Sequence, residues 1–80
     1  MIPTVSSVVA LGERIRRLRQ KRGLTQRALA DAAGVSLVYL RKLEAGERTS
    51  PSFPVLERLA RALGAAVRLE LIEHPKGGRP

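Results

Sequence analysis

The sequence contains no cysteine and a single histidine, His74. The lack of cysteine excludes disulfides, zinc sites built from thiolates and a catalytic thiol, and one histidine cannot form a metal cluster by itself. Aromatic residues are also scarce, with only Tyr39 and Phe53. No apolar run approaches the roughly 18 residues of a membrane span, and Met1 to Leu11 lacks the basic start of a secretory signal. We therefore expect a cytoplasmic protein that has no membrane partner and uses no metal or other cofactor.

Positive charge is what the sequence has in excess. Its 80 residues contain 15 Lys and Arg against 7 Asp and Glu, which gives a formal net charge of +8. Six of the basic residues and one acidic residue lie within residues 1–22. The apolar fraction of 44% is too high for a disordered chain, and this length corresponds to one domain. The charge points to an anionic partner, nucleic acid first and a membrane surface second, with a solvated positive face as an equal alternative.

Four segments have apolar residues at helical spacing, and they predict helices over residues 7–22, 26–33, 36–45 and 52–63. A hydroxyl side chain at the start of each segment can accept a hydrogen bond from a free N–H, and a glycine follows each segment. The predicted N-caps are Ser6 or Ser7, Thr25, Ser36 and Ser52, and the glycines are Gly23, Gly34, Gly46 and Gly64. The predicted core consists of Val8, Leu11, Ile15, Leu18, Leu29, Ala30, Ala33, Val35, Leu40, Leu43, Phe53, Leu56, Leu59, Ala60 and Leu63. Gly12 lowers the stability of the first helix by up to about 1 kcal/mol relative to alanine.

The pattern changes after residue 64. Val67, Leu69 and Leu71 alternate with Arg68, Glu70 and Ile72, which predicts a β-strand over residues 65–73. Glycine and proline occupy four of the seven positions from 74 to 80, which predicts a disordered tail. With residues 1–6 as a flexible N-terminus, the predicted organisation is a helical domain over residues 7–64, then the strand and the tail. The expected fold class is mainly α, a compact bundle of four or five helices with a C-terminal strand.

The segment from Gln26 to Gly46 reads QRALADAAGVSLVYLRKLEAG. It has a small residue, Ala30, where two helices cross, Gly34 at the turn, and Leu40 and Leu43 at core positions of the second helix. This spacing resembles the helix-turn-helix of the phage-repressor-like Xre/Cro–CI family, and the resemblance extends over about residues 11–63. It implies a transcriptional repressor that binds double-stranded operator DNA, with its second motif helix in the major groove. No nucleophile–base pair, metal cluster or phosphate loop points to an enzyme.

The resemblance also implies which residues contact DNA, with residues 36–45 as the recognition helix. The predicted base-reading residues are Ser36, Leu37, Val38, Arg41 and Lys42. The predicted phosphate-binding residues are Gln26, Arg27, Tyr39, Arg48, Thr49, Ser50 and Ser52. Glu44 resembles a family glutamate that forms a structural ion pair with an arginine of the first helix, here Arg19. Many family members have polar residues where this chain has Leu37 and Val38. Apolar side chains can read thymine methyl groups but cannot form hydrogen bonds to adenine.

Several of these residues have a structural alternative. Leu37 lies three residues before Leu40 and would then belong to the core. Arg41 and Lys42 would be ordinary solvated charges, and Tyr39 would cover the edge of the core instead of touching a phosphate. The basic face of the first helix is turned away from the groove in this family, so it would supply only long-range attraction over a Debye length of about 8 Å. That face consists of Arg14, Arg17 and Lys21.

The predicted strand indicates a homodimer. A lone strand leaves its backbone groups unpaired, and the simplest partner is the same strand of a second copy. With a twofold axis at Leu69, Arg68 of one copy faces Glu70 of the other, and Val67 and Leu71 pair on the apolar side. These five residues are the predicted dimerisation residues. The alternative is a strand that folds back on its own subunit.

A four-helix domain followed by a C-terminal strand is similar to HipB- and HigA-type antitoxins. Those proteins bind operator DNA as dimers, repress their own operon and neutralise a toxin, which for HipB is a HipA-like kinase. The resemblance therefore implies an autoregulating antitoxin with a toxin partner. The alternative is a stand-alone phage-type or housekeeping regulator of the same family without a toxin.

Overall fold

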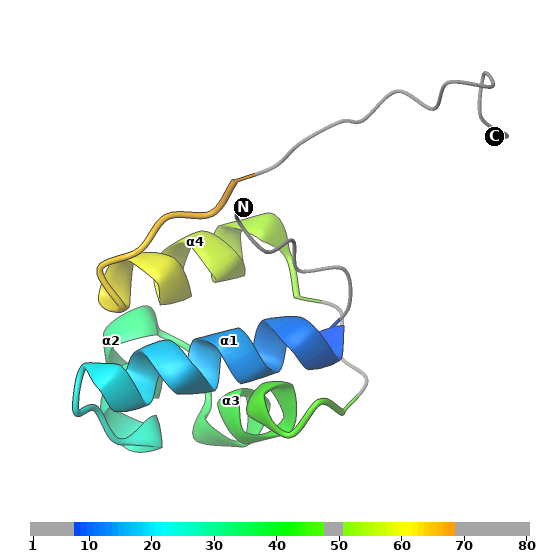
Figure 1. The fold of residues 1–80 in the computed structure, drawn as a ribbon, viewed down its shortest axis with the longest axis horizontal. Coiled ribbons are helices and arrows are strands. Elements are labelled where there is room, and N and C mark those ends of the chain that lie inside the picture. The colour runs from blue at the N-terminus through cyan, green and yellow to red at the C-terminus, as the bar shows by residue number, and fades with distance from the viewer. Residues whose placement is uncertain (1–7, 48–50, 69–80) are drawn as a thin grey trace, which may run out of the picture.

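Four α-helices joined by turns make up the part of the chain that the structure describes. The computed structural model describes residues 8–47 and 51–68, and of Val8 only the backbone. The helices are α1 (Val8–Lys21), α2 (Gln26–Ala33), α3 (Leu37–Glu44) and α4 (Phe53–Ala62) (Figure 1). All four predicted helices are present, and their ends differ from the predicted ends by one residue at most.

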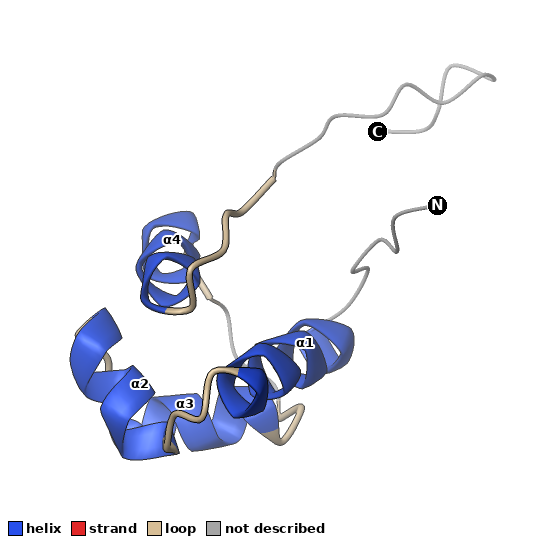
Figure 2. Cartoon of the chain, turned by 60° about the vertical axis from the view of Figure 1, so that its left-hand side comes forward, coloured by secondary structure: helices blue, strands red, loops and turns tan. Residues whose placement is uncertain are grey.

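The helices pack in pairs around the α2–α3 unit. α1 packs on α3, while α2 packs on both α3 and α4. Figure 2 shows α2 and α3 as a bent unit, with α4 above it and α1 to its right, both on the inner side of the bend. None of the other three described helices covers the remaining long side of α3.

Side chains from all four helices meet in one core. The largest fully buried side chains are Leu29 of α2, Leu40 and Leu43 of α3, and Leu59 of α4. The other buried apolar residues are Ile15, Ala30, Ala33 and Leu63, and the partly buried ones around them include Leu11, Leu18, Leu24, Val35 and Val55. Most of the predicted core is therefore confirmed.

Phe53 is the exception in the predicted core, because 40% of its surface is exposed. It is the first residue of α4, and the buried residues of that helix, beginning with Leu59, lie more than one turn further along. Val55 packs against the core instead, so the helical spacing placed Phe53 on the wrong side of the first turn of α4.

Hydroxyl side chains begin three of the helices. Thr25 accepts a hydrogen bond from the N–H of Ala28 at 3.0 Å, and Ser36 accepts one from the N–H of Tyr39 at the same distance. Ser52 caps α4 in the same way. The predicted N-caps at these three positions are confirmed. Gly34, in the turn between α2 and α3, has a φ of 70°, a left-handed conformation that glycine adopts without steric cost.

A side chain from α4 stabilises the C-terminal end of α2. The Nε of Arg58 donates a hydrogen bond to the carbonyl oxygen of Ala33 at 2.9 Å. The last carbonyl groups of a helix lack partners and carry partial negative charge, so a guanidinium group is favourable there. The bond ties the end of α2, and with it the turn that leads into α3, to α4.

The backbones of α1 and α3 come very close at Gly12, which is buried. A Cβ added to Gly12 would overlap the carbonyl oxygen of Leu43 and lie 3.0 Å from its carbonyl carbon. Only glycine permits this approach. The sequence interpretation of Gly12, as a residue that only weakens the helix, was therefore incomplete.

The strand predicted over residues 65–73 is not observed in the described part of this segment. Residues 65–68 are irregular, and residues 69–73 lie outside the described residues. A strand needs a neighbour for its backbone N–H and C=O groups, and residues 8–47 and 51–68 of this single chain contain no other strand. The predicted flexible N-terminus (1–6) and disordered tail (74–80) also lie outside the described residues. Among the residues described, no helix is both long and apolar enough to cross a membrane.

Candidate nucleic-acid interface

α3 has one buried face and one exposed face. Leu40, Leu43 and Glu44 are buried, which fixes the helix against α1 and α2. The residues exposed along the helix and at its C-terminal end recur at intervals of three and four, so they share one face. They are Val38, Arg41, Lys42 and Ala45. Val38 is 60% exposed, the largest value among the described large apolar side chains. The exposed face is thus apolar near the start of α3 and basic further along.

The two residues before Val38 differ in how they lie. Ser36 is exposed at the N-cap, where its oxygen accepts the bond from the N–H of Tyr39 and its own O–H remains free to donate. Leu37 is half-buried. It therefore lies between the two alternatives that the sequence left open, partly packed and partly accessible.

The N-terminal end of α2 lies beside the C-terminal half of α3. Gln26 is half-buried, and its Nε2 donates a hydrogen bond to Oε1 of Glu44 at 3.1 Å. Arg27, the next residue, is exposed. No hydrogen bond within the described residues involves the backbone N–H groups of Gln26 and Arg27. These two amides and the positive end of the helix dipole make a suitable position for an anion.

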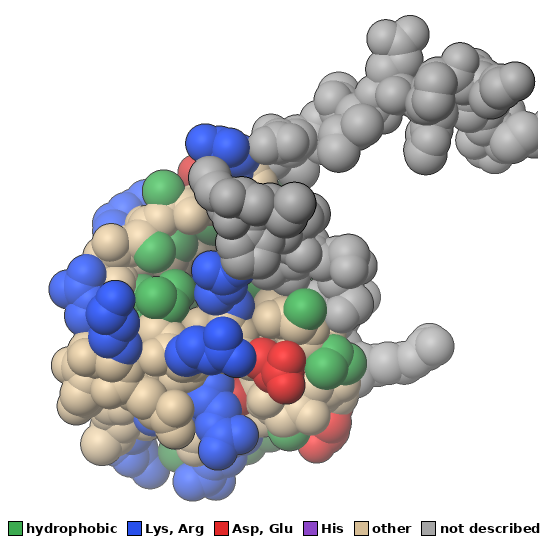
Figure 3. Space-filling model, viewed as in Figure 1, with side chains coloured by type: hydrophobic (Ala, Val, Ile, Leu, Met, Phe, Trp, Pro, Cys, Tyr) green, Lys and Arg blue, Asp and Glu red, His purple; other side chains and the backbone are tan. Residues whose placement is uncertain are grey.

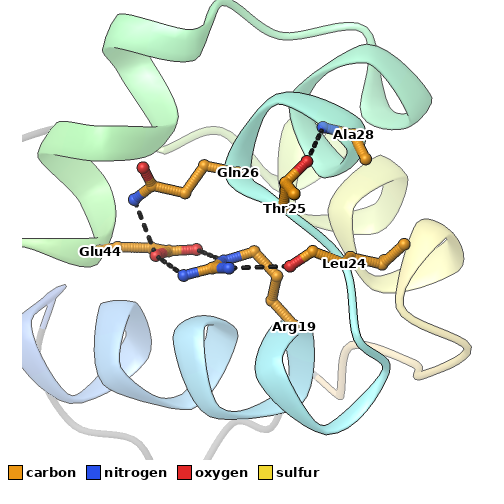
Figure 4. A network of polar contacts seen from close by, with 6 residues as sticks. All are labelled: Arg19, Leu24, Thr25, Gln26, Ala28 and Glu44. Carbon is orange, nitrogen blue, oxygen red and sulfur yellow. Dashed lines mark hydrogen bonds and ion pairs between the residues drawn. The ribbon is translucent and has the colours of Figure 1, made fainter.

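An ion pair joins α1 to α3. The Nε and Nη2 atoms of Arg19 donate to Oε2 and Oε1 of Glu44 at 2.8 and 3.0 Å, while Nη1 donates to the carbonyl oxygen of Leu24 at 2.8 Å (Figure 4). Only 3% of the Glu44 side chain is exposed. The hydrogen bond to Glu44 raises the pKa of Arg19, so the guanidinium stays charged. These are the two residues that the resemblance pairs, and Gln26 is an additional partner that the sequence did not reveal.

A shallow recess of about 350 Å³ opens above this network, between α1, the start of α2 and the end of α3. We call it the polar recess. Its lining residues are Arg16, Arg19, Gln26, Arg41, Glu44 and Ala45. Arg19 and Glu44 are largely covered and form its floor, whereas Arg16 and Arg41 are exposed and form its rim. Nothing in the sequence pattern marks Arg16 as a site residue.

Tyr39 lies at the edge of the core. It is half-buried and packs against the core cluster, and its hydroxyl oxygen is covered and has no hydrogen-bond partner among the described residues. Burial raises the pKa of Tyr39. In this conformation the side chain covers the core edge, and its hydroxyl does not face the solvent as a phosphate ligand would.

The remaining predicted site residues fall into two groups. Ser52 is exposed at the N-cap of α4, where its oxygen accepts from the N–H of Val55 at 3.3 Å. Val67 is half-buried, and Arg68 is exposed. The predicted residues that lie outside the described part of the chain are Arg48, Thr49, Ser50, Leu69, Glu70 and Leu71.

Basic side chains also gather on the face that carries α1 (Figure 3). Arg17 and Lys21 are exposed there, and Arg14 is half-buried. That the charge of α1 acts only at a distance stays a prediction. No group of three or more potential metal ligands occurs among the described side chains.

Residues 10–71 match the sequence model of a family described as helix-turn-helix domain. The chain belongs to this helix-turn-helix family. The match covers α1 to α4 and the turns between them, so the predicted repressor-like helix-turn-helix fold is confirmed.

Relatives of this helix-turn-helix domain are transcriptional regulators. The chain is 48% identical over 63 residues to the regulator DdrOP3 of Deinococcus deserti, an alignment that covers 79% of this chain and 47% of DdrOP3. It is 35% identical over 63 residues to the regulator SinR of Bacillus subtilis, covering 79% of this chain and 57% of SinR. The chain thus spans about half the length of these curated relatives.

Solved structures of other helix-turn-helix proteins have the same fold. The clp gene regulator ClgR of Corynebacterium glutamicum superposes with a TM-score of 0.71 at 39% identity, over 84% of this chain and 85% of that one. SinR in complex with DNA gives 0.67 at 34% identity, over 70% and 89%. A HipA–HipB–O2–O3 complex gives 0.71 at 19% identity, over 85% and 94%, a likeness of fold alone.

Proposed function

We propose that this chain is a DNA-binding transcriptional regulator whose helix α3 enters the major groove. The observation that carries the proposal is the uncovered face of α3, where Val38, Arg41 and Lys42 point away from a helix that is otherwise firmly packed. A helix fits the major groove, and its outward side chains then reach the base edges. The similarity to SinR, which has been solved with DNA, supports this role.

The exposed face suggests how bases are read. Val38 and the accessible part of Leu37 suit thymine methyl groups, whereas Lys42 suits the acceptor atoms of guanine. Ser36 can donate its free O–H to either kind of acceptor. Arg41 lies on the same face but also lines the polar recess, where it can contact an anion.

The start of α2 suggests how the DNA backbone is held. The free amides of Gln26 and Arg27 and the exposed Arg27 side chain lie where α2 meets α3, next to the proposed recognition helix. Phosphate contacts of this kind position a protein on DNA without reading sequence. The exposed Ser52 and the loop residues 48–50 belong to the same proposal as a second backbone contact.

We also propose that two copies bind together. Because a major-groove helix on a twofold-related dimer meets half-sites roughly one helical turn apart, the operator would be nearly palindromic with half-sites about 10 base pairs apart. The alternating segment within residues 65–73 supplies the proposed contact between the two copies. In it, Arg68 of one copy faces Glu70 of the other. Sizing the chain with and without residues 65–80 tests this, because a chain that sizes as a monomer in both forms would contradict it.

The antitoxin role is a narrower version of the same function. It rests on the sequence resemblance to HipB- and HigA-type proteins, since the HipA–HipB complex shares only the fold with this chain. Co-purification of a toxin with the expressed operon would support the antitoxin. Its absence, with DNA binding intact, would favour a stand-alone regulator.

DNA binding is tested by selecting duplexes from a random-sequence library with the full chain at physiological salt. The selected duplex then serves as the probe for Lys42→Ala, with Lys21→Ala as a control that removes the same exposed side chain from α1. We expect Lys42→Ala to weaken binding by about 1–3 kcal/mol and to relax preference at one position. Equal binding by the two variants would refute α3 as the reading helix, and failure to recover any duplex would refute DNA binding itself.

A further inference from the structure

The polar recess is lined by more positive charge than its one carboxylate can neutralise. Three guanidinium groups and one carboxylate line it, which leaves two positive charges unbalanced. Glu44 already accepts two bonds on Oε1 and one on Oε2, from Arg19 and Gln26. Its carboxylate therefore has little capacity left for the arginines of the rim.

The two rim arginines have no partner of their own within residues 8–47 and 51–68. No hydrogen bond or ion pair joins the side chain of Arg16 or Arg41 to a described residue, and both side chains are exposed. They approach the recess from different helices, Arg16 from α1 and Arg41 from α3. Each guanidinium retains a planar set of N–H donors that matches two oxygens of a phosphate.

The floor of the recess fixes the helices that carry the two rim arginines relative to each other. Arg19 and Glu44 tie α1 to α3, and Gln26 ties the start of α2 to the same carboxylate (Figure 4). The close backbone approach at Gly12 fixes the same two helices one to two turns away along α1. The recess is thus a preformed surface whose donors come from three helices, and α2 has no acidic residue in its first turn to repel an anion.

We propose that the polar recess binds a phosphate group through Arg16 and Arg41, and that Arg41 therefore grips the DNA backbone instead of reading a base. The assignment to DNA rests on the proposed function, whereas the preference for phosphate rests on the recess alone. It divides the exposed face of α3 by role. Val38 and Lys42 face the groove, while Arg41, at the margin toward α1, sets the register of the helix on the DNA.

The DNA test compares sequence-selected and scrambled duplexes. Arg41→Ala and Arg16→Ala are measured on both duplexes over a range of salt concentrations, with Arg17→Ala as a control that removes an exposed arginine of α1 outside the recess. A charge-assisted hydrogen bond corresponds to a loss of about ten- to a hundredfold in affinity. We expect that loss on both duplexes alike, with a salt slope reduced by about one.

The outcomes separate the roles of Arg41. If Arg41→Ala weakens only the selected duplex, Arg41 reads a base and the proposal is overturned. If Arg41→Ala and Arg16→Ala behave like Arg17→Ala, the recess does not hold a phosphate of DNA. Arg41→Lys keeps the charge but loses the planar fork, so it should recover only part of the affinity. All of these side chains are exposed, and circular dichroism of each variant checks that it folds.

A second arm uses inorganic phosphate without DNA and stands even if the chain binds no duplex. Phosphate is titrated into the full chain while NMR follows the backbone amides of Gln26 and Arg27 and the Nε–H groups of Arg16 and Arg41. We expect saturable shifts in these signals that disappear in Arg41→Ala and persist in Arg17→Ala. Shifts that are equal in both variants, or absent from the wild type, would overturn the recess as a phosphate site.

Discussion

Replacing Gly12 by alanine tests the packing that positions α3. In an isolated helix the change is favourable by up to about 1 kcal/mol, because alanine has the higher helix propensity. In this fold the new Cβ would overlap the carbonyl oxygen of Leu43 and lie 3.3 Å from the Cα of Glu44. These are backbone atoms, which cannot rotate away as a side chain can, so α1 and α3 must separate. Overpacking of this kind costs about 1–3 kcal/mol, and rigid neighbours put Gly12 at the upper end. The expected net loss of stability is about 2 kcal/mol.

Urea unfolding followed by circular dichroism measures this change. With a slope near 1 kcal/mol per molar for a domain of this size, the midpoint should fall by about 2 M. Gly23→Ala is the contrasting variant, since Gly23 has a φ of 70° but no atom within 4 Å of an added Cβ. It should lose only the roughly 1–2 kcal/mol cost of a left-handed alanine, without moving the helices. A Gly12→Ala chain as stable as the wild type, or more stable, would show that α1 and α3 do not meet as closely as described.

Three further results are expected. Glu44→Gln removes the charge that pairs with Arg19 and should lower the unfolding free energy by about 3 kcal/mol. This is the lower end for a broken buried ion pair, because Arg19 keeps its hydrogen bond to the carbonyl oxygen of Leu24. A urea midpoint close to the wild-type value would contradict this. Tyr39→Phe removes a covered hydroxyl without a partner and should raise the unfolding free energy at neutral pH by about 1 kcal/mol; a loss would reveal a hydrogen bond to that oxygen. Because burial raises the pKa of Tyr39, the unfolded chain ionises at this residue before the folded one, so the wild type loses stability as pH rises above about 10. Unfolding free energies across that pH should therefore fall less steeply for Tyr39→Phe than for the wild type, and parallel curves would argue against the shift.

The helices were predictable because each has a local signal. Thr25, Ser36 and Ser52 can cap a helix whatever the rest of the chain does, and all three do so here. The spacing of apolar residues likewise indicated which side of α1, α2 and α3 faces the core, but for α4 it missed Val55 and included the exposed Phe53. These signals act over a few residues, so they can be recognised in a single sequence.

The contacts between residues far apart in the sequence could not be predicted in the same way. Nothing near Gly12 indicates that a backbone 31 residues further on lies against it, and Arg58 has no pattern that marks a bond to Ala33. Gln26 looked like a phosphate ligand, but the structure also gives it a partner in Glu44. The Arg19–Glu44 pair was anticipated only through the family resemblance, since two charges 25 residues apart show no periodicity. The predicted strand needs a partner segment that the described part of this single chain lacks.

The two faces of α3 have an evolutionary consequence. The residues that hold the helix are Leu40, Leu43 and Glu44, while the side chains of the outward residues Val38 and Lys42 form no hydrogen bond or ion pair within the described residues. Surface substitutions without such partners usually change stability by less than about 0.5 kcal/mol. Mutations at the outward positions can therefore accumulate without a loss of folding. If α3 reads DNA as proposed, the same eight-residue helix can change its target sequence while the residues that hold it stay the same.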